Sequence, residues 1–107
     1  MKDTQLFDRF WLWLSDAYAK QLAIEHGEYV DLYYVADRVC NDHEITMPQF
    51  TDTLQWFFPE ALNNGYLIAL EVDATPTRRA QLARRKHKII IDGCERTIIA
   101  LKHKKGK

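Results

Sequence analysis

The sequence of 107 residues is poor in cysteine, glycine and serine, and each shortage argues against a class of function. Two cysteines, Cys40 and Cys94, are too few for the disulfide framework of a small secreted domain, so we expect two reduced thiols. The four glycines stand far apart, which excludes a glycine-rich phosphate-binding loop. The single serine, Ser15, lies mid-helix with no placed base, which argues against a serine hydrolase. We therefore expect a protein that is not an enzyme and uses no cofactor.

The histidines and cysteines do not form a convincing metal site. Cys40 and His43 have a ligand-like spacing, and His87, Cys94 and His103 follow in the second half of the chain. A structural zinc site takes four ligands in close local pairs, and these pairs are incomplete. Cys40 also falls on an apolar stripe, where a thiol acts as a small hydrophobic side chain. We expect no bound metal.

Long hydrophobic runs are missing as well. No stretch approaches the roughly 18 apolar residues that a membrane span needs. The first residues lack the basic region, apolar stretch and small-residue cleavage site of a secretory signal. Hydrophobic residues make up 47% of the chain and charged residues 28%, values typical of globular proteins. We expect one globular domain in the cytoplasm, without contact with a membrane.

Charge is divided sharply along the chain, although the formal net charge is zero. Residues 1–74 hold four basic and thirteen acidic side chains, a net charge of −9. Residues 75–107 hold eleven basic and two acidic side chains, a net charge of +9. This division indicates either a polyanion-binding end on an acidic body or a basic segment folded over the acidic one.

Apolar residues at steps of three and four predict three helices. The first spans residues 4–26, with Asp3 as its N-cap and Gly27 as its stop. A short edge strand at residues 28–30 precedes the second helix, which begins after the N-cap Asp31. The apolar stripe of the first helix is Phe7, Trp11, Leu14, Tyr18 and Leu22, widened by Phe10, Trp13 and Ala17. That of the second helix is Leu32, Val35, Ala36, Val39 and Cys40.

The third helix begins after Thr46, which has the spacing of a capping box with Gln49. Pro59 has no N–H to donate, so we expect it either to kink this helix or to interrupt it, with a split near Phe58. Residues 63–65, Asn-Asn-Gly, end the helix. The predicted core stripe of the helix is Phe50, Leu54, Phe57 and Leu62.

The second half of the chain changes to an extended pattern. β-prone apolar runs predict three strands, at residues 66–72, 88–91 and 97–101. Asp92-Gly93 predicts a hairpin turn between the last two strands, because both central positions of the favoured turn need positive φ. Residues 75–87 form either a short helix or a long loop. The domain then covers residues 1–101, and residues 102–107 form a basic tail.

The order helix, short strand, helix, turn, helix, strand, basic excursion, strand resembles that of winged helix-turn-helix domains. The resemblance covers about residues 5–101 and is most specific over residues 29–70, where two capped helices and a tight turn run into a strand. It implies an α+β fold of three helices and a small antiparallel β-sheet with a long basic wing at residues 73–88. It also implies that the helix at residues 47–58 lies in a DNA major groove while the wing touches the backbone.

The helix that the resemblance places in the groove departs from the superfamily in its charge. No lysine or arginine occurs between Val39 and Thr77, and Asp52 and Glu60 would repel phosphates. The polar side chains that remain for reading bases are Gln49, Thr51, Thr53 and Gln55. Phosphate contacts must therefore come from elsewhere in the chain.

The wing holds six cations within eleven residues, namely Arg78, Arg79, Arg84, Arg85, Lys86 and Lys88. The planar guanidinium suits phosphate, and a cluster of this kind dominates non-specific affinity for nucleic acid. We predict a non-catalytic module that binds DNA or RNA through the wing, as a small regulator or an accessory subunit of a DNA-processing complex. A solvated basic loop, or one paired with the acidic body, is the structural alternative.

A second class of function is open. The acidic, aromatic-rich helical body could dock a protein partner through Trp11, Trp13, Tyr33 and Tyr34. The resemblance also implies a homodimer through the first helix, because winged helices commonly dimerise there. The absence of lysine and arginine from the third helix favours this class, whereas the basic wing favours nucleic acid. No small-molecule substrate is indicated by the sequence.

Overall fold

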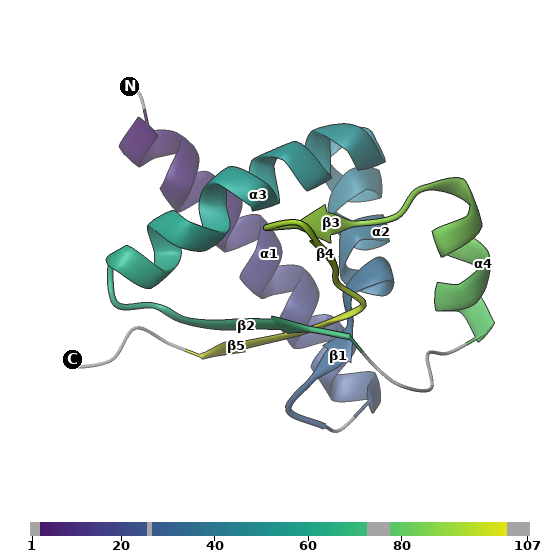
Figure 1. The fold of residues 1–107 in the computed structure, drawn as a ribbon. Coiled ribbons are helices and arrows are strands. Elements are labelled where there is room, and N and C mark those ends of the chain that lie inside the picture. Colours follow the sequence, from purple (N-terminus) through teal and green to yellow (C-terminus); the bar gives the residue numbers. More distant parts are fainter. Residues whose placement is uncertain (1–2, 26, 73–77, 103–107) are drawn as a thin grey trace.

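A computed structural model describes residues 3–25, 27–72 and 78–102, and it shows an α+β fold in which helices pack behind a small antiparallel sheet (Figure 1). The predicted tail is only partly described, because Lys102 ends a strand and residues 103–107 lie outside the described residues. In chain order the elements are α1 (Asp3–Glu25), β1 (Val30–Asp31), α2 (Leu32–His43), α3 (Met47–Asn63), β2 (Leu67–Glu71), α4 (Arg78–Lys86), β3 (Ile90–Ile91), β4 (Cys94–Glu95) and β5 (Ile98–Lys102).

Helix α1 buries the middle of the wide stripe that the sequence predicts. Its fully buried side chains include Phe10, Leu14 and Ala17, whereas Phe7 and Trp11 pack partly exposed at the margin. The helix already includes Asp3, so the prediction that this residue stands before the helix as its N-cap is wrong. Bulky side chains on both margins make the apolar face broad, which allows the helix to pack against α2, α3 and the sheet together.

The caps of α2 and α3 are those that the sequence predicts. The Asp31 carboxylate accepts hydrogen bonds from the backbone N–H groups of Tyr33 at 2.9 Å and Tyr34 at 3.4 Å. The hydroxyl of Thr46 accepts from the N–H of Gln49 at 3.2 Å, and the Gln49 side chain accepts in return from the N–H of Thr46 at 2.8 Å. These bonds satisfy N–H groups that have no partner inside the helix, so both starting points are determined locally.

Helix α3 differs from its prediction at two positions. It continues from Met47 to Asn63 through Pro59, so of the two outcomes predicted for Pro59 the interruption near Phe58 is wrong. Because Pro59 has no N–H, the backbone carbonyl of Gln55 lacks its usual partner inside the helix. Pro59 and Gln55 are both exposed, so water can donate to this carbonyl instead. Leu62 was expected in the core but is 49% exposed, and Ala61 is buried in its place because it continues the 3.6-residue phase of the stripe.

Aromatic rings from α1 and α3 form the centre of the core. The ring of Phe57 stacks on that of Phe7 with centroids 4.6 Å apart and meets Phe10 edge-on at 5.1 Å. Phe10 also lies 5.7 Å from Phe50, and Phe10, Phe50 and Phe57 are all fully buried. The predicted core positions Val35 and Val39 of α2 are buried against the same cluster, so the helical part of the predicted core is confirmed at these residues.

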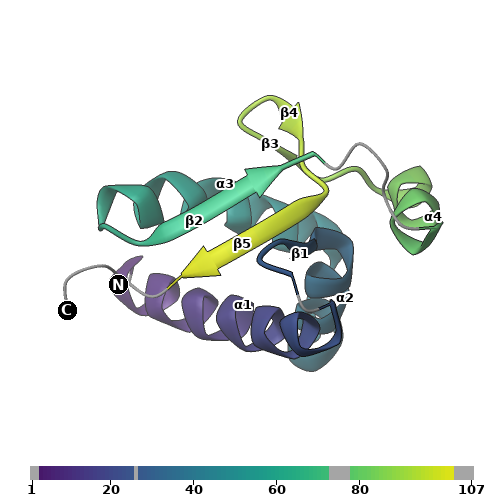
Figure 2. The ribbon, with the colours of Figure 1, turned by 90° about the horizontal axis from the view of Figure 1, so that it is seen from below.

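The main sheet places its last strand in the middle. Strand β5 pairs antiparallel with β1 on one side and with β2 on the other, giving the order β1-β5-β2. Val30 faces Ile99 across the first pair, and Ile68 faces Leu101 across the second. Figure 2 shows the helices lying behind one face of this sheet, with α4 set to the side. The two edge strands, β1 and β2, are therefore joined by β5, the last strand of the described chain.

The turn at Asp92-Gly93 has the predicted geometry but joins a different pair of strands. Its φ values are 61° and 80°, and it closes a separate hairpin of β3 and β4 in which Ile91 faces Cys94. The expected pairing of residues 88–91 with 97–101 is wrong. The chain passes from the β3–β4 hairpin to the main sheet at Thr97. The N–H of Thr97 donates to the Glu71 carbonyl at 2.8 Å, and its carbonyl accepts from the N–H of Leu32 at 2.9 Å.

The described part of the excursion between β2 and β5 is folded. Residues 78–86 of the segment left open as helix or loop form α4, so the described chain has four helices where three were predicted. Residues 73–77 of the predicted wing lie outside the described residues. Within the described residues, no helix combines the length and apolarity required to cross a lipid bilayer.

Candidate nucleic-acid interface

Helix α4 is attached to the body through buried apolar contacts and one buried hydroxyl. Ala80 on the helix and Ile89 just after it are buried in the common core. Tyr33 of α2 is only 3% exposed, and its hydroxyl accepts a hydrogen bond from the backbone N–H of Ile89 at 3.1 Å. Burial raises the pKa of this phenol above its ordinary value. Tyr33 therefore serves as an internal attachment and does not present its ring to a protein partner, contrary to its prediction.

One predicted phosphate ligand is engaged within the chain. Arg84 forms a two-pronged pair with Glu95 of β4, from Nε to Oε2 at 2.5 Å and from Nη2 to Oε1 at 2.8 Å. Glu95 also lies 3.5 Å from the Tyr33 hydroxyl, at the long limit of a hydrogen bond. The bonds to Glu95 raise the pKa of the Arg84 guanidinium above its ordinary value, so Arg84 is permanently charged. The pair fixes α4 relative to the β3–β4 hairpin.

Two further cations gather beside Arg84 on the outer side of α4. Arg85 and Lys88 are both exposed, and with Arg84 and Gln81 they line an open hollow of about 420 Å³. None of the described residues that line this hollow is acidic. Gln81, Arg84 and Arg85 of α4, with Lys88 just after the helix, can surround a phosphate oxygen with donors.

The other predicted wing cations lie apart from the hollow. Lys86 lines a separate pocket on the inner side of α4, and Arg78 is exposed at the first residue of the helix. Arg79 belongs to α4 by its backbone, but its side chain lies outside what the structure describes. The six cations that sequence reasoning treated as one cluster thus divide over different sides of α4.

Most of the predicted base-reading side chains already have partners within α3. The side chain of Gln49 accepts from the N–H of Thr46 in the capping box. The hydroxyl of Thr53 donates to the backbone carbonyl of Gln49 at 2.8 Å. Thr51 donates to the Met47 carbonyl and lies 2.9 Å from the Nε2 atom of His87. Gln55 is exposed on the same helix. The hydroxyl of Thr51 is thus used to join α3 to the end of α4 and is not presented to a ligand.

The remaining predicted partner residues lie on or near the surface. Trp11 packs against Tyr66 with ring centroids 4.7 Å apart, and Trp13 stacks on His43 at 3.9 Å with the planes 11° apart. Tyr34 is half-buried on α2. Sequence reasoning overlooked Leu12, which is 65% exposed on α1 because it falls off the apolar stripe.

The two cysteines are free thiols in different surroundings. Cys40 is half-buried with its sulfur 3.8 Å from that of Met47, and burial raises its pKa to about 11. Cys94 is exposed in β4. No group of three His, Cys, Asp or Glu side chains suited to a metal ion occurs within residues 3–25, 27–72 and 78–102. His103 lies beyond the described part of the chain.

Sequence reasoning missed Glu95 and the pocket on the inner side of α4. Glu95 is one of only two acidic residues after residue 74, and this rarity was the available signal that it has a cationic partner. The pocket has no signal in the sequence, because it is formed by three helices that meet in space.

Comparison of the chain with family models, curated proteins and solved structures found no match.

Proposed function

We propose that this chain is a winged helix domain that binds nucleic acid without catalysis, through phosphate contacts on the outer side of α4. The observation that carries the proposal is the hollow formed by Gln81, Arg84, Arg85 and Lys88, in which three cations converge and no described lining residue is acidic. Phosphate contacts supply most of the sequence-independent affinity of proteins for nucleic acid.

The arrangement of the strands supports the winged helix part of the proposal. A capped helix, a short turn and a second capped helix lead into β2, and β5 returns to lie between β1 and β2. The excursion between β2 and β5 occupies the position of a wing in the chain order. Here it carries a helix and a hairpin, so the wing is a folded unit attached to the body by Tyr33.

The contacts around Arg84 suit a preorganised phosphate site. Glu95 already holds the Arg84 guanidinium in place and offsets its charge, so Arg84 positions α4 at the edge of the hollow. Arg85 and Lys88 are the exposed donors that would meet phosphate oxygens. Because α3 carries no lysine or arginine, binding would follow the backbone and show little base preference.

The test is fluorescence anisotropy with a labelled duplex of about 20 base pairs at about 50 mM salt. We expect Arg85→Gln combined with Lys88→Gln to weaken binding at least tenfold, equally on unrelated sequences. Lys20→Gln is the matched control, because Lys20 is an exposed cation of α1 paired with Asp16 at 3.2 Å. Absence of binding by the unmodified chain, or an equal loss in the control, would contradict the proposal.

A second candidate function is association through α1. Leu12 is the observation that favours it, because this side chain is 65% exposed beside an open groove of about 650 Å³ that is also lined by Leu22 and Leu101. Sedimentation equilibrium would show a dimer at micromolar concentration that Leu12→Glu dissociates. A monomer at all concentrations would remove a homodimer through this face.

A further inference from the structure

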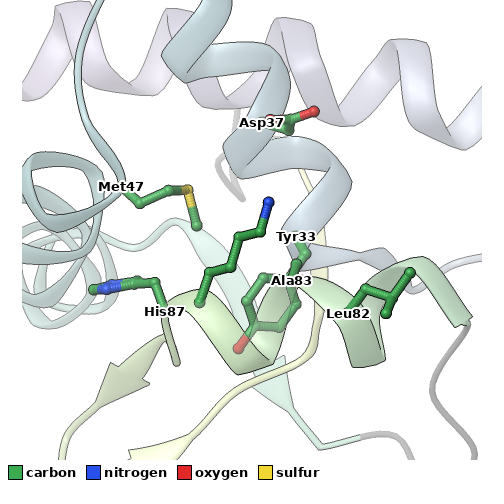
Figure 3. A pocket seen from close by; sticks show the side chains of 7 residues that line it. Tyr33, Asp37, Met47, Leu82, Ala83 and His87 are labelled. Carbon is green, nitrogen blue, oxygen red and sulfur yellow. The ribbon is translucent and has the colours of Figure 1, made fainter.

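A pocket of about 340 Å³ separates the inner side of α4 from α2 and the start of α3. This volume lies at the lower end of the roughly 300–1,000 Å³ that small-molecule sites span. Figure 3 shows Met47 and His87 on one side of it, Leu82 on the other and Asp37 above on α2. Residues from three helices thus surround a space large enough for a small organic molecule.

Several walls of this pocket are held by contacts with residues outside its lining. His87 is fixed through its Nε2 atom to Thr51 at 2.9 Å, and the Tyr33 hydroxyl is fixed to the N–H of Ile89 at 3.1 Å. The sulfur of Met47 lies against that of Cys40 at 3.8 Å. A ligand entering the pocket would therefore meet walls that are already in place, which lowers the entropic cost of binding.

The lining carries one group of each charge across an apolar surface. Asp37 comes from α2 and Lys86 from α4, while Met47, Leu82 and Ala83 supply the apolar part. Asp37 has another interaction of its own, and a carboxylate has lone pairs for more than one donor. A purely anionic ligand would be repelled by Asp37 and a purely cationic one by Lys86, so the pocket is complementary to a molecule with both charges.

We propose that this pocket binds the zwitterion of an apolar amino acid. The ammonium group of the ligand lies at Asp37, its carboxylate at Lys86, and its side chain on Met47, Leu82 and Ala83. The inference goes beyond nucleic-acid binding and does not depend on it, because the pocket and the phosphate hollow lie on different sides of α4.

Isothermal titration calorimetry on the full chain, without nucleic acid, tests this site with three probes that share a phenyl ring and differ in charge. They are L-phenylalanine with both charges, 2-phenylethylamine with the positive charge alone, and 3-phenylpropionate with the negative charge alone. We expect saturable binding of phenylalanine at one site, with each single-charge probe at least tenfold weaker. Failure of phenylalanine to bind, or equal binding of all three probes, would overturn the proposal.

Charge-removing variants locate the binding. Asp37→Asn and Lys86→Gln should each weaken phenylalanine binding about tenfold, the loss expected for one charged contact. Lys20→Gln removes an exposed cation of α1, away from both sites, and should leave phenylalanine binding unchanged. Lys86 is exposed, so its variant keeps the fold and remains informative if Asp37→Asn destabilises the chain. Unchanged binding in Lys86→Gln would place phenylalanine outside this pocket and refute the assignment.

Discussion

The most informative perturbation of the fold is Tyr33→Phe, because it removes one oxygen atom and keeps the ring. That oxygen accepts the hydrogen bond from the N–H of Ile89 at 3.1 Å, and Tyr33 is only 3% exposed. Its contact with Glu95 is at 3.5 Å and contributes little. The variant therefore isolates the attachment of the excursion to α2.

The expected cost follows from the buried donor that the variant leaves behind. An unsatisfied buried N–H costs about 1–3 kcal/mol, so Tyr33→Phe should lower the free energy of unfolding by that amount. For a domain of this size each kcal/mol corresponds to a decrease in Tm of roughly 4–8 °C. Urea denaturation followed by tryptophan fluorescence measures the first quantity, and a thermal scan measures the second.

Amide hydrogen exchange identifies where the loss arises. The N–H of Ile89 should lose protection in the Tyr33→Phe variant, while the central strand around Ile99 keeps its own. Tyr29→Phe is the matched control, since Tyr29 is exposed and should change stability by less than about 0.5 kcal/mol. A cost below that limit in Tyr33→Phe, together with unchanged exchange at Ile89, would refute the claim that this hydroxyl attaches the excursion.

Two further predictions concern the core and the buried thiol. Phe57→Ala should cost about 3–5 kcal/mol in chemical denaturation, whereas Leu62→Ala should cost less than about 1 kcal/mol because half of that side chain is exposed. Equal losses would contradict the observed phase of α3. Burial raises the pKa of the Cys40 thiol in the folded chain to about 11, from an ordinary value of 9.0. As the pH rises, the unfolded chain therefore loses this proton first, and the free energy of unfolding should decrease between pH 9.0 and about 11. Cys40→Ala should remove that decrease. A thiol reagent near pH 8 should modify exposed Cys94 well before Cys40. Equal rates of modification of the two thiols would place Cys40 at the surface.

Features that depend on a few neighbouring residues could be predicted from the sequence. The cap at Asp31 and the capping box of Thr46 with Gln49 are set by side chains within three positions of the groups they bond. The positive φ angles at Asp92 and Gly93 likewise follow from a two-residue turn. In each case the favourable geometry is local, so no knowledge of the rest of the fold was required.

Features that depend on residues far apart in the chain could not be predicted in the same way. Nothing near Ile98 indicates that β5 leaves the adjacent hairpin to pair with β2 and β1. The exchange of Leu62 for Ala61 in the core reflects a small difference in helical phase, which a stripe with apolar residues at both positions leaves open. The sequence predicts which cations belong to the candidate site. The pairing of Arg84 with Glu95 and the division of the cluster over two sides of α4 depend on how the chain folds and could not be predicted from the sequence.

The measurement that tests the central claim most directly is the salt dependence of duplex binding, compared between the unmodified chain and the variant carrying Arg85→Gln and Lys88→Gln. Each phosphate contact contributes about −0.9 to the slope of log affinity against log salt on duplex DNA. If Arg85 and Lys88 each neutralise one phosphate, the slope of the variant should be shallower by about 1.8. An equal slope in the two proteins, whatever their affinities, would contradict phosphate binding by the outer side of α4.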